Sequence, residues 1–139
     1  MILLDTSGLL AALVASQRAH RASRSALESD GGPLVLSPFV LAELDYLLTK
    51  TVGAATALAF LREVASGIYE LATFDSKDVA AAIGVMARYE DLGVGLADAS
   101  IVVLAERLRT DRILTLDERH FRALRTPGGG SFTLLPADA

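Results

Sequence analysis

Residues 2–7 read ILLDTS, three apolar residues followed by an acid and two hydroxyl residues. Residues 113–117 read ILTLD, another apolar run that leads into an acid. Short runs rich in Ile and Leu that stop at a polar residue are typical of buried strands. We therefore predict strands over residues 2–4 and 113–116, with Asp5 and Asp117 directly after them.

Strand-like and helical segments alternate along the rest of the chain. Further strands are predicted over residues 34–36, 68–74 and 132–135. Helices are expected to begin near Thr6, and to run over about 19–28, from Ser37-Pro38 to a break at Gly53, on to about 65, over 76–89, over 97–108 and, as a short turn, over 117–124. This alternation predicts one α/β domain over residues 1–139, with a parallel sheet covered by helices on both faces.

Four acids, Asp5, Glu43, Asp98 and Asp117, are the candidate site. Ligands bind at the carboxyl ends of the strands in such sheets, and Asp5 and Asp117 occupy those ends. Glu43 and Asp98 lie on helices among apolar neighbours, where a buried acid is costly without a partner. The four acids are expected to converge at one sheet edge, where a hard cation such as Mg²⁺ or Mn²⁺ would neutralise them.

Each acid also has a purely structural interpretation. Asp5 and Asp117 stand where they could cap the helices that follow them. Asp98 lies in the first turn of its helix, where a carboxylate favours the helix dipole. Glu43 could lie on a solvated face. Taken singly, each structural interpretation is the stronger one, and only convergence favours a site.

Three hydroxyl residues beside the acids are secondary candidates. Thr6, Ser7 and Thr115 could hold a metal-bound water or orient a carboxylate, although capping and strand propensity explain them equally well. His120 could face a phosphate, but we interpret it as a partly exposed structural histidine.

The composition excludes several other chemistries. The chain has no Cys and 2 His, which argues against thiol chemistry and an imidazole-rich zinc site. It has no Gly-x-Ser-x-Gly, no Gly-x-Gly-x-x-Gly after the first strand and no Walker A loop. No secretory signal and no membrane-spanning run are recognised, so a cytoplasmic protein without membrane contact is expected.

The net charge of −4 at first argues against a nucleic-acid partner. Without the four acids, the Asp and Glu residues fall from 17 to 13, equal to the 13 Lys and Arg, so the rest of the chain is neutral. The mean hydropathy of +0.43 is high for a small monomer, and it predicts apolar surface that meets a second copy or another protein.

Four motifs together resemble a PIN-domain nuclease, and more narrowly a VapC-type toxin of a type II toxin–antitoxin pair. They are LDTS at residues 4–7, the segment from Ser37-Pro38 to Ala42-Glu43-Leu44, LADAS at 96–100 and LTLDERHF at 114–121. The resemblance covers nearly the whole length. It implies a three-layer α/β/α fold with a central, mostly parallel sheet of four to five strands.

The resemblance also implies an activity, a cofactor and partners. The activity is that of an endoribonuclease that uses Mg²⁺ or Mn²⁺ to cut structured RNA such as tRNA or rRNA, in a homodimer inhibited by a cognate VapB-type antitoxin. Asp5, Glu43, Asp98 and Asp117 match the family's metal-binding acids, and Thr115 matches a supporting hydroxyl.

We assign metal binding to Asp5, Asp98 and Asp117, with Glu43 binding metal or orienting the attacking water. Arg18, Arg21 and Arg119 are candidate contacts for RNA phosphates. Two alternatives stay open: a housekeeping PIN nuclease in RNA processing, and a non-catalytic module whose acids hold a structural ion.

Overall fold

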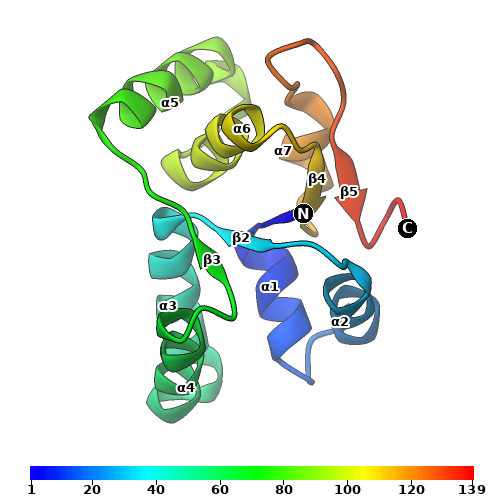
Figure 1. The fold of residues 1–139 in the computed structure, drawn as a ribbon. Helices are drawn as coiled ribbons and strands as arrows, with labels where there is room; N and C mark the ends of the chain where they lie inside the picture. Colours follow the sequence, from blue (N-terminus) through cyan, green and yellow to red (C-terminus); the bar gives the residue numbers. More distant parts are fainter.

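Five parallel strands form the centre of the molecule in this computed structural model, which describes residues 1–139 (Figure 1). The strand order is β3-β2-β1-β4-β5. The strands are β1 (Ile2–Leu4), β2 (Leu34–Leu36), β3 (Glu70–Leu71), β4 (Arg112–Leu114) and β5 (Thr133–Leu135). The predicted α/β class is confirmed, and the sheet is parallel throughout rather than mostly parallel.

Helices cover both faces of this sheet (Figure 1). One face carries α1 (Thr6–Leu13), α2 (His20–Ser29), α3 (Pro38–Val52) and α4 (Ala54–Ala65). The other carries α5 (Ser76–Arg88), α6 (Leu96–Leu108) and α7 (Glu118–Ala123), with a short 3-10 turn, η1 (Glu90–Leu92), between α5 and α6. The connections change faces after β3, which is why β4 lies beside β1 and not beside β3.

The helix starts follow from local sequence. The Ser37 hydroxyl accepts a hydrogen bond from the Phe39 N–H at 3.2 Å, and Pro38 occupies the first position of α3. Asp75 and Asp78 form a reciprocal capping box at the start of α5. Gly53, with φ of 107°, separates α3 from α4 because other residues rarely adopt that conformation.

Two predicted strands are shorter than expected. The strand predicted over residues 68–74 is only Glu70–Leu71, because β3 is an edge strand that pairs with β2 alone and exposes both residues. The strand predicted over residues 113–116 ends at Leu114. Thr115 turns its hydroxyl to the Asp117 N–H at 2.9 Å, which directs the chain out of the sheet and into α7.

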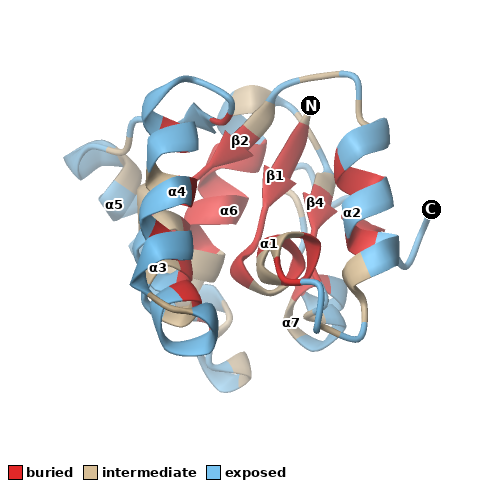
Figure 2. Cartoon of the chain, turned by 90° about the horizontal axis from the view of Figure 1, so that it is seen from below, coloured by how far each residue is buried: buried red, intermediate tan, exposed pale blue.

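The core lies between the sheet and the helices, and β1 is buried along its whole length (Figure 2). α1 packs so closely on β4 that a Cβ atom at Gly8 would overlap the backbone carbonyl of Leu114. Phe121 anchors α7 and is 1% exposed. None of the helices combines the length and the apolar character needed to cross a membrane.

Candidate active site

The candidate site lies where β1 and β4 end side by side. Leu4 pairs with Leu114, so the next residues, Asp5 and Thr115, emerge together from the sheet. The connection from β1 leads towards β2, whereas the connection from β4 leads towards β5. Such a topological switch point leaves a crevice outside the carboxyl ends of the strands, where open α/β sheets bind ligands.

Asp5 is the most enclosed of the four acids, at 5% exposed. Its Oδ2 accepts hydrogen bonds from the Thr115 hydroxyl at 2.6 Å and from the Ser7 hydroxyl at 2.9 Å. Burial raises the pKa of Asp5 to about 6, although both hydroxyls oppose that rise. Asp5 precedes α1 but makes no side-chain capping bond, so its capping interpretation is wrong.

The hydroxyls of Ser7 and Thr115 link the strand ends. They lie 3.3 Å apart, and the Ser7 oxygen also accepts the Leu116 N–H at 2.9 Å. Thr115 connects Asp5 to the backbone of Asp117, so one side chain fixes two of the acids. Thr6 is not part of this network, because its buried hydroxyl has no hydrogen-bond partner.

Asp98 and Asp117 meet across His120. The His120 Nδ1 atom lies 2.8 Å from Oδ2 of Asp98 and 3.1 Å from Oδ2 of Asp117. Asp117 does cap α7, because its Oδ1 accepts the His120 N–H at 3.0 Å. The structural interpretation of His120 missed this central position. The sequence did contain a signal, since an acid and a histidine three residues apart can project side by side from one turn.

Glu43 is exposed, so the expectation of an apolar setting is wrong. α3 buries Val40, Leu44 and Leu48, which recur every four residues, and this places Glu43 outside the buried stripe. Glu43 still belongs to the electrostatic neighbourhood of the site. Burial chiefly raises the pKa of Asp98, and the negative charges of Asp117 and Glu43 raise it further, against the opposing contact with His120.

Asp98 thus connects the four acids. The charge of Asp98 also raises the pKa of Asp5. His120 lies between Asp98 and Asp117 and contacts both. One group of ligand atoms, from Asp98, Asp117 and His120, lies within 4.8 Å of one another, which suits a single ion. Asp5 and Glu43 lie outside that group.

None of the four acids pairs with Lys or Arg. The arginines that form ion pairs bind other acids: Arg24 with Glu28, Arg107 with Asp78, Arg112 with Asp30, and Arg122 with Glu118 and Asp138. A buried carboxylate beside other carboxylates is costly without a cation. The donor set of carboxylate oxygens with one imidazole nitrogen therefore fits a divalent metal ion.

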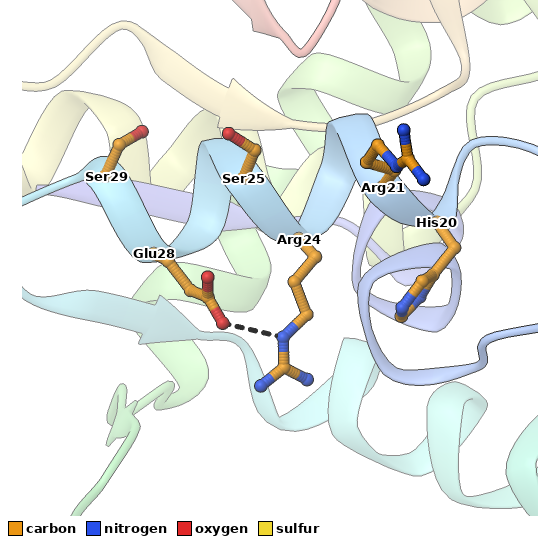
Figure 3. A pocket seen from close by; sticks show the side chains of 6 residues that line it. All are labelled: His20, Arg21, Arg24, Ser25, Glu28 and Ser29. Carbon is orange, nitrogen blue, oxygen red and sulfur yellow. Dashed lines mark hydrogen bonds and ion pairs between the residues drawn. The ribbon is translucent and has the colours of Figure 1, made fainter.

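The three arginines considered for RNA binding are all exposed but lie in different places. Arg119 precedes His120 in α7, at the site. Arg21 lines a shallow polar hollow along α2, together with His20, Arg24, Ser25, Glu28 and Ser29 (Figure 3). Arg18 lies in the turn before α2, and no hydrogen bond or ion pair joins Arg18 or Arg21 to the four acids.

Known proteins resemble this chain over nearly its whole length. The PIN domain family model matches residues 2–126. Ribonuclease VapC26 of Mycobacterium tuberculosis (strain ATCC 25618 / H37Rv) is 47% identical over 135 residues, which cover 97% of this chain and 100% of that protein.

Solved structures share the fold. VapC20 of Mycobacterium tuberculosis, described as a toxin that cleaves the sarcin-ricin loop, has a TM-score of 0.78 and 20% identity, covering 84% of this chain and 90% of that one. DNA-bound VapBC from Salmonella typhimurium has a TM-score of 0.67 and 22% identity, and the match covers 96% of this chain and 98% of that one. VapBC2 from Rickettsia felis, bound to a fragment of promoter DNA, has a TM-score of 0.67 and 21% identity, and the match covers 96% of this chain and 98% of that one. This chain therefore belongs to the PIN domain family, in its VapC group.

Proposed function

We propose that this protein is the toxin of a type II toxin–antitoxin pair and a metal-dependent endoribonuclease that hydrolyses RNA phosphodiester bonds. One observation supports the chemistry above all: Asp98 interacts electrostatically with the other three acids, and no Lys or Arg pairs with any of the four. The 47% identity to a protein named as a ribonuclease supports RNA as the substrate. We further propose that the whole chain forms one nuclease domain and that it acts in the cytoplasm.

Asp98 and Asp117 belong to the group of ligand atoms within 4.8 Å of one another, and the charge of Asp98 also acts on Asp5. Asp5, Asp98 and Asp117 hold Mg²⁺ or Mn²⁺, and the hydroxyls of Ser7 and Thr115 keep Asp5 oriented. Such an ion lowers the pKa of a bound water and stabilises negative charge on a phosphate. Glu43, exposed on α3, binds the ion or orients the attacking water.

Metal-dependent cleavage of RNA by the purified chain tests this proposal. A chelator should abolish the cleavage, and added Mg²⁺ or Mn²⁺ should restore it. Asp98→Asn should lower the rate by at least about a hundredfold, as expected for loss of a group central to the site. Asp111→Asn is the matched control and should keep full activity, because Asp111 is an exposed acid whose side chain makes no hydrogen bond or ion pair. A chelator-resistant rate, or a fully active Asp98→Asn variant, would refute the nuclease assignment and favour a structural ion.

The proposed partners are a VapB-type antitoxin and a second copy of the chain. Exposed apolar side chains such as Tyr46, Leu58, Ile68 and Ile83 provide surface for such contacts. Co-expression with a small protein encoded next to this gene should suppress growth arrest and yield a complex on size-exclusion chromatography. Normal growth without the partner, together with metal-dependent RNA cleavage by the purified chain, would favour the housekeeping alternative.

A further inference from the structure

His120 occupies a position that a hydrogen bond alone does not explain. Its Nδ1 atom lies 2.8 Å from a carboxylate oxygen of Asp98 and 3.1 Å from one of Asp117. An imidazole nitrogen carries at most one hydrogen, so it donates fully to one oxygen only. A metal ion shared by all three atoms satisfies both carboxylates and the nitrogen together.

The two distances from Nδ1 agree with that arrangement. Neighbouring ligands of an octahedral ion with bonds of about 2.1 Å lie about 3 Å apart. The distances from Nδ1 to the two carboxylate oxygens are close to this value, and all three ligand atoms lie within 4.8 Å of one another. The side chains are 18–33% exposed, so an ion can enter from solvent.

The backbone keeps the histidine and Asp117 together. Oδ1 of Asp117 accepts the His120 N–H at 3.0 Å, which leaves Oδ2 free to face the ring. The next residue, Phe121, is 1% exposed and anchors the short helix in the core. An acid and a histidine three residues apart bind one metal in the same way in carboxylate-bridged metal proteins built on helices.

We propose that His120 also binds the ion directly through Nδ1, beside Asp98 and Asp117, and thereby makes the site prefer a first-row transition ion such as Mn²⁺ over Mg²⁺. Mg²⁺ takes oxygen ligands almost exclusively, whereas first-row transition ions accept an imidazole nitrogen. This inference rests on the proposed function, since it concerns the ion of the same site.

Pulsed electron paramagnetic resonance of Mn²⁺ added to the full chain tests it without an activity assay. Directly bound imidazole should produce ¹⁴N modulation of the Mn²⁺ echo in the unaltered protein. His120→Asn keeps an N–H that can donate to Asp98 but has no imidazole, so the modulation should disappear. The dissociation constant for Mn²⁺, measured by calorimetry, should rise at least about tenfold, and that for Mg²⁺ less than about threefold.

The chain contains one other histidine, which serves as the matched control. His20 lies on α2, and its Nδ1 is 2.8 Å from the carbonyl oxygen of Ala11. His20→Asn should leave both the ¹⁴N signal and the Mn²⁺ affinity unchanged. The role of His120 would be overturned if Mn²⁺ bound to the unaltered protein without ¹⁴N modulation. If Asp98→Asn abolished that Mn²⁺ binding, the metal site itself would remain supported. A chain that binds neither Mn²⁺ nor Mg²⁺ would overturn this inference and the proposed function together.

Discussion

Asp5→Asn should stabilise the metal-free protein at neutral pH, because the buried, ionised carboxylate of Asp5 lowers the stability of the fold. Burial raises the pKa of Asp5 from its ordinary value of 3.8 to about 6. This rise is about two pH units, and each unit corresponds to about 1.4 kcal/mol. Ionised Asp5 therefore lowers the free energy of unfolding by about 3 kcal/mol above pH 6.

The sign of the pH dependence follows from the raised pKa. Between pH 4 and 6 the folded chain retains a proton on Asp5 that the unfolded chain has already lost. The contribution of Asp5 to stability is therefore fully favourable below about pH 4 and is lost as the pH rises through about 6. Asn is neutral throughout, and its oxygen can still accept from Thr115 and Ser7.

Urea unfolding in EDTA, at pH 4 and at pH 8, measures this effect. The Asp5→Asn variant should exceed the unaltered protein by about 2–3 kcal/mol at pH 8 and by less than about 0.5 kcal/mol at pH 4. Asp111→Asn, at an exposed acid, should change stability by less than about 0.5 kcal/mol at both pH values. A variant that is no more stable than the unaltered protein at pH 8 would refute the reasoning that the acids destabilise the metal-free fold.

Other substitutions test the same structure. Thr115→Val keeps the shape of the side chain but removes the hydroxyl that contacts both Asp5 and the Asp117 N–H. Denaturant titration should show a free energy of unfolding lower by about 2–4 kcal/mol, because a buried carboxylate and an N–H lose their partner. An unchanged free energy of unfolding would contradict the role of Thr115 in linking the two acids. Gly8→Ala should lower the free energy of unfolding by about 1–3 kcal/mol, because the added methyl group would keep α1 from its close approach to β4. Gly84→Ala, in α5 with open space around it, should raise that free energy by about 0.5–1 kcal/mol. Equal effects of the two substitutions would exclude the close packing at Gly8. Arg119→Gln should weaken RNA binding and reduce its dependence on salt by roughly one ion, measured by fluorescence anisotropy over a salt series; an unchanged slope would remove Arg119 from the RNA contact.

The sequence determined the parts of this protein that depend on local pattern. Apolar runs ending in Asp5 and near Asp117 predicted two strands, and Ser37-Pro38 predicted a helix start that the structure confirms. These features depend on residues a few positions apart, so a single sequence displays them. The four motifs around Asp5, Glu43, Asp98 and Asp117 together also suggested the family that the comparisons confirm.

Tertiary structure alone decided how the acids meet. Glu43 is exposed because α3 turns another stripe towards the core, and β3 is short because only one neighbour pairs with it. His120 lies between Asp98 and Asp117 because the packing of α6 beside α7 joins residues 22 positions apart. A distance of 2.8 Å between side chains on different helices depends on the whole packed core, and no local pattern contains it.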